Sequence, residues 1–222
     1  MDAQSVGAVL GLGFVLGMKH ATDADHVVAV TTIVGRSRSP WASAQVGAMW
    51  GIGHTLTLLL VGGAIILFHL VMPPHLGLGL EFLVACMLVA LGVWNLRTGR
   101  APRAHAHPHP PTRVGLRPLG VGLVHGLAGS AAIALLVLSS IPKPVLGVFY
   151  LVVFCAGTIA GMMVLTTMIS LPVSLATSRS ERLSVWLGRV AGVLSVGFGL
   201  VLMARIGFVD GLFSAHPSWS PE

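Results

Sequence analysis

Residues 17–30, GMKHATDADHVVAV, decide the fold, because they place one Lys, two His and two Asp inside apolar sequence. Apolar residues lie on both sides of this stretch, at 6–16 and 27–34. A charged side chain near the centre of a bilayer costs roughly 2.5–3.5 kcal/mol on insertion scales and marks a functional site by default. Imidazoles and carboxylates are also donors that borderline divalent metals accept, so the stretch predicts a metal site in a membrane helix. Its candidate ligands are His20, Asp23, Asp25 and His26.

The composition indicates an integral membrane protein with one polytopic domain. Apolar residues make up 55% of the chain and charged residues 9%, whereas a soluble domain is about 25% charged. The net charge of +6 does not indicate nucleic-acid binding, because the basic residues lie between apolar segments. Cys86 and Cys155 lie in separate apolar runs without CxxC spacing, so we expect neither a disulfide framework nor a cysteine metal site.

The apolar runs predict an all-α membrane bundle of about six spans, because about 20 apolar residues cross a bilayer as a helix. The predicted spans are 5–34, 42–71, 78–97, 118–140, 144–172 and 183–207. The first span is over-long and holds the polar stretch at its centre, so we expect it to be strongly tilted or broken. Broken helices at mid-membrane often build ion sites.

Arginine placement predicts the orientation of these spans. With six spans, the loops at 35–41, 98–117 and 173–182 share one side of the membrane. The arginines in these loops and their flanks are Arg36, Arg38, Arg97, Arg100, Arg103, Arg113, Arg117, Arg179 and Arg182. The opposite side holds Lys143 and Arg205. By the positive-inside rule the arginine-rich loops are cytoplasmic, so both termini face outward.

The loop at 98–117 carries three histidines in alternation, His105, His107 and His109, among several prolines. A short histidine-rich tract can capture metal loosely. The alternative is a disordered proline-rich linker that joins two halves of the chain, and the two roles are compatible.

The two halves of the chain resemble each other at offsets of 104 to 107 residues. The matched positions are Gly17 to His20 with Gly122 to His125, Gly53 with Gly157, and Gly92 with Gly199. We therefore expect a three-helix repeat at 1–97, a linker at 98–117, and a second three-helix repeat at 118–222 with a short outward tail. Because each half holds an odd number of spans, the repeats are inverted, and such repeats place a binding site near the midplane. Chance similarity between glycine-rich apolar segments is the alternative.

A continuous helix brings three of the candidate ligands to one face. At about 100° per residue, His20, Asp23 and His26 lie within an arc of about 120°. Asp25 falls about 140° from His20, so it either orients a histidine ring or is brought in by local unwinding. His54 lies in the second span and is the next candidate ligand, although a single buried histidine is more often a hydrogen-bonded core residue.

Two further residues are assigned to the neighbourhood of the site. His125 occupies the repeat position of His20 but has no carboxylate beside it, so it is either a pathway residue or a packing residue. Lys19 would repel a metal ion bound at the site. We therefore expect Lys19 to form an ion pair with Asp23 or Asp25.

The segment KHATDADHVVAV closely resembles the signature of the nickel/cobalt transporter (NiCoT) family, a His followed after four residues by Asp-His. The matching residues are His20, Asp25 and His26, with Asp23 in the extended form of the signature. WGIGHTLTLL at 50–59 resembles the family's second motif, carried by Gly53, His54 and Thr55. The short length and HGLAGSAA at 125–132 look most like the UreH-type permeases of that superfamily.

This resemblance implies a permease of a bacterial-type plasma membrane, with no enzymatic activity and no prosthetic group. Ni²⁺ or Co²⁺ is then the transported substrate, and Thr55 joins His125 and Lys19 as candidates for its pathway. The ligand histidines must be neutral to bind, so metal binding should release protons and weaken in acid.

Four functions remain to be compared. The first is uptake of Ni²⁺ or Co²⁺, and the second is efflux of the same ions, an alternative that the histidine-rich loop keeps open. The third is an intramembrane metalloenzyme, which would need a His-Glu-x-x-His pair that the sequence lacks. The fourth is a non-transporting membrane partner in urease or hydrogenase maturation. Homo-oligomerisation is compatible with all four.

Overall fold

The computed structural model describes residues 3–34, 39–68, 72–98, 116–127, 144–214 and 217–219. The first half forms α1 (Ala3–His20), α2 (Ala24–Val34), α3 (Pro40–Phe68) and α4 (Pro74–Thr98). The second half forms α5 (Arg117–His125), α7 (Pro144–Arg179), α8 (Glu181–Ala204) and the π-helical turn η2 (Arg205–Val209). All regular structure in the described residues is helical, which confirms the predicted all-α class.

Among the described residues, four helices are long and apolar enough to cross a membrane, so the chain is a helical membrane protein. The crossing segments are Pro40–Ala64, Pro74–Thr98, Val145–Leu175 and Arg182–Val209. They lie in α3, α4, α7 and α8 with η2, and correspond to four of the predicted spans. The predicted span at 118–140 is described only as far as residue 127. The count of six spans therefore stays a prediction.

The first predicted span is broken in the middle. α1 ends at His20, α2 begins at Ala24, and the backbone N–H groups of Thr22 and Asp23 close a tight turn on the carbonyls of Lys19 (2.8 Å) and His20 (3.1 Å). The Asp23 carbonyl accepts the next helical bond, from Val27, at 3.0 Å. Aspartate is favoured at such a helix start, because its side chain suits the N-terminal positions and the helix dipole. The continuous helical face predicted for this segment is therefore wrong, and the alternative of local unwinding is what the structure has.

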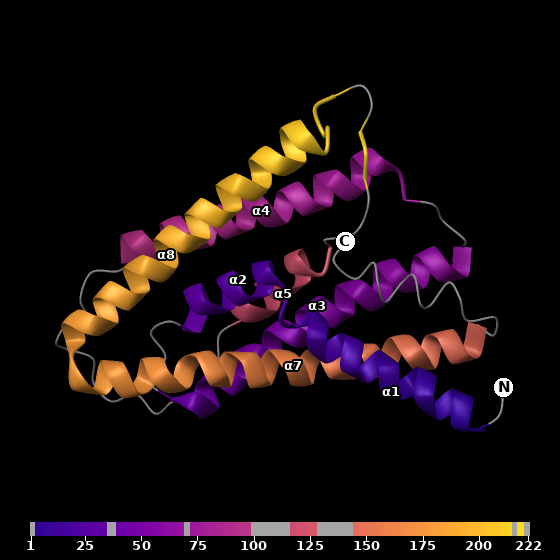
Figure 1. Ribbon diagram of the computed structural model, residues 1–222, viewed down its shortest axis with the longest axis horizontal. Coiled ribbons are helices and arrows are strands. Elements are labelled where there is room, and N and C mark those ends of the chain that lie inside the picture. The colour runs from indigo at the N-terminus through magenta and orange to yellow at the C-terminus, as the bar shows by residue number, and fades with distance from the viewer. Residues whose placement is uncertain are drawn as a thin grey trace.

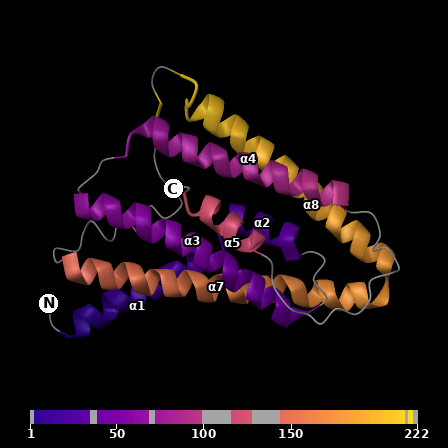
Figure 2. The same ribbon diagram turned by 180° about the vertical axis from the view of Figure 1, so that it is seen from behind.

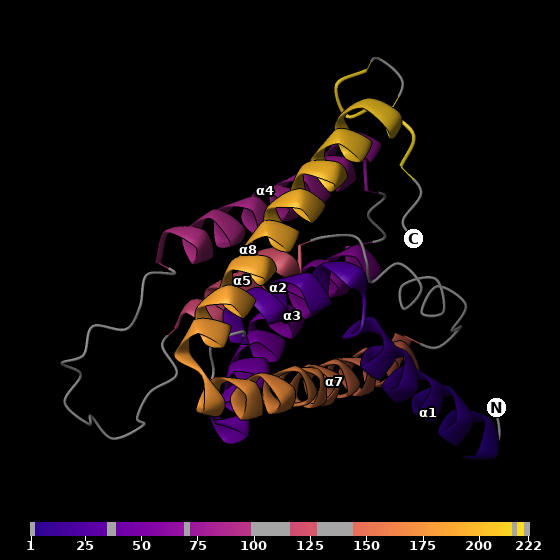
Figure 3. The same ribbon diagram turned by 60° about the vertical axis from the view of Figure 1, so that its left-hand side comes forward.

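The long helices form two groups with the short helices between them. α7 packs against α1 and α3, α4 packs against α8, and α5 lies along α3 (Figure 1). Seen from behind, α2 and α5 lie between the α3–α7 group and the α4–α8 pair (Figure 2). Figure 3 shows α8 running from the end of α7, across the front of the short helices, toward the start of α4. The break between α1 and α2 therefore lies inside the molecule.

Most of the helix ends that flank the loops predicted to share one membrane side lie toward the same end of the molecule. The end of α2, the start of α3, the end of α4 and the junction of α7 with α8 all lie toward the left in Figure 1. The starts of α1, α4 and α7 lie toward the right. The predicted loop arginines Arg36, Arg38, Arg100, Arg103 and Arg113 lie outside the described residues.

α1 and α7 approach each other backbone to backbone. A Cβ atom added to Gly17 of α1 would overlap the carbonyl oxygen of Phe154 in α7. One added to Gly157 of α7 would overlap the carbonyl oxygen of Phe14 in α1. Small residues allow this approach in lipid, where no hydrophobic effect drives helices together.

α3 and α5 meet through the same arrangement. A Cβ atom on Gly53 of α3 would overlap the carbonyl oxygen of Leu119, and one on Gly122 of α5 would overlap that of Trp50. Each of these four positions lies 104 or 105 residues from its counterpart in the contact between α1 and α7. The chain therefore makes one type of helix contact twice.

The contact between α4 and α8 has the same internal correspondence. A Cβ atom on Gly92 would lie 2.8 Å from the backbone nitrogen of Val196, and one on Gly199 would lie 3.0 Å from that of Val89. Gly92 and Gly199 are 107 residues apart, and so are Val89 and Val196. This contact is symmetric between the two halves of the chain.

Asn95 joins three helices near the end of α4. Its side-chain amide donates to the carbonyl of Gly188 in α8 at 3.0 Å and to that of Thr32 in α2 at 3.4 Å. We expect Asn95→Ala to lower the free energy of unfolding by about 0.6–1.7 kcal/mol, the range measured for polar contacts between membrane helices. Denaturation of the purified protein in mixed detergent measures this. Thr31→Ala is the control, because the Thr31 hydroxyl bonds to the Val28 carbonyl within α2; an equal loss in both variants would contradict the prediction.

Candidate metal centre

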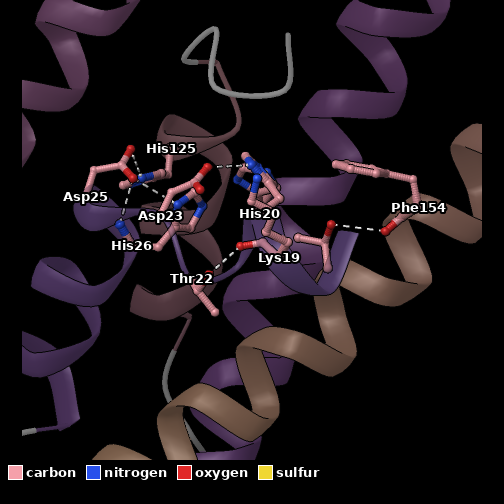
Figure 4. A network of polar contacts seen from close by, with 10 residues as sticks. Lys19, His20, Thr22, Asp23, Asp25, His26, His125 and Phe154 are labelled. Atoms are coloured by element: carbon pink, nitrogen blue, oxygen red, sulfur yellow. Dashed lines mark hydrogen bonds and ion pairs between the residues drawn. The ribbon is translucent and has the colours of Figure 1, made fainter. Parts of the chain in front are cut away.

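Four histidines and two aspartates meet where the broken span faces α3 and α5. They come from the end of α1, the turn after it, the first turn of α2, the middle of α3 and the end of α5. The residues are His20, Asp23, Asp25, His26, His54 and His125. The four imidazoles are buried, with exposed fractions of 0% for His26 and His125, 1% for His54 and 5% for His20. Figure 4 shows the side chains around His20, His26 and His125.

The Asp25 carboxylate joins two imidazoles from opposite halves of the chain. Its Oδ1 accepts from His26 Nδ1 at 3.0 Å and from the His26 backbone N–H at 2.8 Å, and its Oδ2 accepts from His125 Nε2 at 2.9 Å (Figure 4). An ionised carboxylate can only accept hydrogen bonds. The two imidazoles therefore carry their protons on the nitrogens that face Asp25. The opposite nitrogens, His26 Nε2 and His125 Nδ1, keep their lone pairs, as in the carboxylate–histidine pairs that support metal ligands.

His20 and His54 face each other across the cluster. His20 Nδ1 donates to Asp23 Oδ2 at 2.9 Å, so the lone pair of His20 lies on Nε2. That atom lies 3.0 Å from His54 Nε2. Two nitrogens at right angles on one ion, each about 2.0–2.1 Å from it, are separated by about 2.9 Å. The pair can therefore share one proton or bind one metal ion.

Three imidazole nitrogens of the cluster are buried without a partner among the described residues. They are His26 Nε2, His54 Nδ1 and His125 Nδ1. A buried polar atom left without a hydrogen bond costs about 1–3 kcal/mol and calls for an explanation. Ligand atoms of His20, His26 and His54 lie within 4.8 Å of one another, and so do those of Asp25, His26 and His125. This donor set fits a borderline divalent metal ion.

Glycines bring the end of α5 close enough for His125 to reach Asp25. A Cβ atom on Gly126 would lie 2.5 Å from the His54 carbonyl oxygen, and Gly122 faces the backbone one turn earlier in α3. The Thr57 hydroxyl also donates to the Leu123 carbonyl at 2.9 Å, which fixes α5 along α3. Backbone contact between α3 and α5 thus places a histidine of the second half beside the carboxylate of the first.

Two aromatic residues, which the sequence analysis did not select, lie against the imidazoles. The Trp50 ring stacks on His26, with centroids 5.7 Å apart and planes at 23°, and its centroid lies 5.5 Å from that of His125. The Phe154 ring lies 5.6 Å from that of His20. Both aromatic residues are buried. The offset of 104 residues between them, equal to that of Gly53 and Gly157, was the signal that could have found them.

The predicted metal ligands lie together. His20, Asp23, Asp25, His26 and His54 all belong to the cluster, and the structure adds His125, whose role the sequence left open. Both alternatives for Asp25 hold, since local unwinding brings it in and it orients two imidazole rings. Metal binding by these residues stays a prediction.

Other predicted residues lie elsewhere. Lys19 is exposed and forms no ion pair with Asp23 or Asp25 among the described residues, so that prediction is wrong. The two carboxylates contact imidazoles instead, at 2.9–3.0 Å. The Thr55 hydroxyl donates to the Ile52 carbonyl within α3, at 3.1 Å. His105, His107 and His109 lie outside the described residues.

The chain is similar to a protein named urease accessory protein UreH from Bacillus sp. (strain TB-90), with 40% identity over 96% of this chain and 98% of that protein. Two proteins of Arabidopsis thaliana are more distant. Chloroplast protein FOR GROWTH AND FERTILITY 2 is 25% identical over 90% of this chain, and FOR GROWTH AND FERTILITY 1 is 26% identical over 85%. The chain covers 57% and 56% of their lengths. No protein-family model and no solved structure matches the chain.

Proposed function

Because the chain belongs to the family of the urease accessory protein UreH, we propose that it is a permease that carries Ni²⁺, or the similar ion Co²⁺, across a membrane. The His/Asp cluster is the binding site of the transported ion, which is a substrate and not a resident cofactor. We also propose that the chain belongs to the wider nickel/cobalt transporter superfamily, which the resemblance of the signature around His20 and His26 supports. The imported metal would serve a nickel enzyme such as urease or hydrogenase.

The buried imidazole nitrogens without partners are the observation that carries this proposal. A packing role for His26 and His125 would be expected to satisfy both nitrogens of each ring, whereas His26 Nε2 and His125 Nδ1, the nitrogens opposite Asp25, lack a partner among the described residues. Asp25 and Asp23 hold the protons of three imidazoles on the nitrogens that face the carboxylates, which leaves the lone pair of each ring on its other nitrogen. Imidazole-rich sites suit Ni²⁺, and geometry then selects among divalent ions.

The repeated helix contacts support transport over static binding. We propose that 1–97 and 118–222 are inverted repeats joined by the linker at 98–117. The contact of α1 with α7, made by Gly17 and Gly157, matches that of α3 with α5, made by Gly122 and Gly53. Inverted repeats of this kind bind their substrate between the halves and open to alternate sides of the membrane. His26 and His125, bridged by Asp25, lie on this boundary.

The arginines support one orientation of the chain in the membrane, and the uptake reading then gives the path of the metal. We propose that the end of the molecule where α4 ends and α8 begins is cytoplasmic, because the arginine-rich loops leave from it. Both termini then face outward, and the membrane is the plasma membrane of a bacterial-type cell. Metal would enter beside α1 and leave toward the start of α3.

A second candidate is a non-transporting membrane factor that delivers nickel during urease maturation. The name of the Bacillus relative favours it, since that protein is called a urease accessory protein. Such a factor would use the same cluster to bind nickel and would hand it to a partner. Efflux of the same ions through the same site is the remaining alternative.

Accumulation of ⁶³Ni²⁺ in cells that express the chain tests the proposal, with efflux from preloaded cells measured in parallel. Accumulation above that of cells without the protein supports uptake. Faster loss from preloaded cells reverses the direction and keeps the site. If neither movement changes while the purified protein still binds nickel, the accessory factor is the better account.

Asp25→Asn should lower the Ni²⁺ affinity of the purified protein by about 10–100-fold, the usual loss when an outer partner of a metal ligand is removed. The amide nitrogen of Asn donates, so it cannot face both His26 Nδ1–H and His125 Nε2–H. One imidazole must then move its proton onto the nitrogen that would bind metal. Equilibrium binding of ⁶³Ni²⁺ measures the affinity. Asp210→Asn is the control, because Asp210 lies after η2 and contacts Arg205 at 3.8 Å; equal affinities in the two variants would contradict the prediction.

A further inference from the structure

Trp50 and Phe154 occupy equivalent positions in the two halves of the chain. Trp50 lies one turn before His54 in α3, and Phe154 lies one turn before Thr158 in α7. The carbonyl of Trp50 faces Gly122 and that of Phe154 faces Gly17. Both rings are buried, with exposed fractions of 0% and 2%. Each covers part of the histidine cluster, Trp50 over His26 and His125 and Phe154 over His20.

The two rings lie toward opposite ends of the molecule. α3 and α7 run side by side in opposite directions (Figures 1 and 2). The turn before His54 therefore points toward the end where α3 begins, and the turn before Thr158 points toward the end where α7 begins. The cluster lies between these two turns, and its imidazoles are at most 5% exposed. The Asp23 and Asp25 side chains are more open, at 37% and 16% exposed, so the closure concerns the imidazoles. An ion that binds to them has to displace a covering group.

No hydrogen bond of the side chain holds either ring in place among the described residues, whereas the backbone beside each ring is fixed. Gly17 and Gly122 hold the backbone at both rings against a neighbouring helix, so a shift of either turn would disrupt a helix contact. The indole Nε1 of Trp50 has no partner among the described residues, and the phenyl ring of Phe154 has no polar group. Rotation of either side chain therefore breaks no hydrogen bond.

We propose that Trp50 and Phe154 are a pair of aromatic gates, each of which separates the metal site from one face of the membrane. The inference rests on the proposed transport function and adds to it the residues that open the metal site to one face of the membrane at a time. Trp50 closes the site on the side of His26 and His125, toward the start of α3. Phe154 closes it on the side of His20, toward the start of α7. Each ring also positions the imidazoles that it touches.

Reaction of individual histidines with diethylpyrocarbonate tests the proposal, read residue by residue by mass spectrometry on the purified full chain in detergent. We expect Trp50→Ala to raise the rate at His26 and His125 by roughly tenfold, equivalent to ~1.4 kcal/mol, with His20 little changed. Phe154→Ala should raise the rate at His20 and leave His125 little changed. Trp50→Phe should keep the site closed, because it retains a ring.

Exposed aromatic residues on the same helices provide matched controls. Trp41 of α3 and Phe149 of α7 are 71% and 58% exposed. Trp41→Ala and Phe149→Ala should leave the rates at all four histidines unchanged. A general loosening of the fold by the gate variants would raise every rate together. In that case Trp50→Leu and Phe154→Leu decide, because they keep most of the side-chain volume. A higher reaction rate for the histidines on one side only supports the gates, whereas a uniform rise in the rates, or no rise, overturns them.

This test does not depend on nickel movement, so the two proposals can fail separately. Suppose that the wild type neither accumulates nor extrudes ⁶³Ni²⁺, but each gate variant exposes only the histidines on its own side, as expected. The transport function then fails, and the two rings stand as closures of a metal-binding site. If the wild type transports nickel and the gate variants show no selectivity in labelling, the gates fail and the transport function stands.

Discussion

Cells that express His20→Ala or His54→Ala are expected to accumulate no more ⁶³Ni²⁺ than cells without the protein. The Nε2 atoms of these residues lie 3.0 Å apart, the separation of two neighbouring ligands on one ion. Removing either residue leaves one nitrogen where the ion needs two. Loss of an outer partner already lowers metal affinity about 10–100-fold, and loss of a ligand itself should exceed that range.

The matched control for this experiment is His75→Ala. His75 is exposed in the first turn of α4, away from the cluster, so the variant should accumulate nickel as the wild type does. Expression in the membrane is measured for each variant, because uptake scales with it. Accumulation by His20→Ala and His54→Ala at the level of His75→Ala would remove the cluster from the transport pathway.

Gly122→Ala is expected to destabilise the protein strongly, by about 1–3 kcal/mol or more, as overpacking of a close contact does. The added Cβ would overlap the Trp50 carbonyl oxygen and lie 2.9 Å from the His54 nitrogen. Both are backbone atoms and cannot rotate away, so α5 would have to move off α3. His125 would then lose its contact with Asp25.

Gly120 provides the control on the same helix. A Cβ atom at Gly120 has no heavy atom within 4 Å among the described residues, so Gly120→Ala should be neutral or stabilising by up to about 1 kcal/mol. Gly17→Ala and Gly11→Ala form the equivalent pair in α1, since nothing lies within 4 Å at Gly11. Detergent denaturation midpoints measure all four variants. Equal midpoints for Gly122→Ala and Gly120→Ala would show that the backbone contact is unimportant.

Much of the cluster could be predicted from sequence, because its members share short motifs. His20, Asp25 and His26 lie within seven residues, and the polar stretch in an over-long span predicted the break between α1 and α2. His54 was found because a metal site needs additional donors. Local patterns thus identified both the residues and the local distortion of the helix.

The remaining contacts depend on tertiary structure. His125 is 100 residues from Asp25, and nothing beside it in the sequence indicates a carboxylate partner. Trp50 and Phe154 are ordinary apolar residues of membrane helices until the packing places imidazoles against them. Lys19 was assigned an ion pair from its position in the sequence, whereas the helix break turns Asp23 and Asp25 toward His20, His26 and His125.

The bridge from Asp25 to His125 also has a consequence for how the chain is made. Asp25 enters the membrane 100 residues before its second partner exists. At about 5–20 residues per second, the ribosome needs roughly 5–20 s to supply that partner. During this interval the newly inserted first half holds a membrane carboxylate of which one oxygen still lacks its imidazole. Arrival of α5 then completes the site and makes the first contact between the two halves, before α7 and α8 add theirs. Synthesis of the second half therefore supplies the partner that the buried carboxylate of the first half lacks.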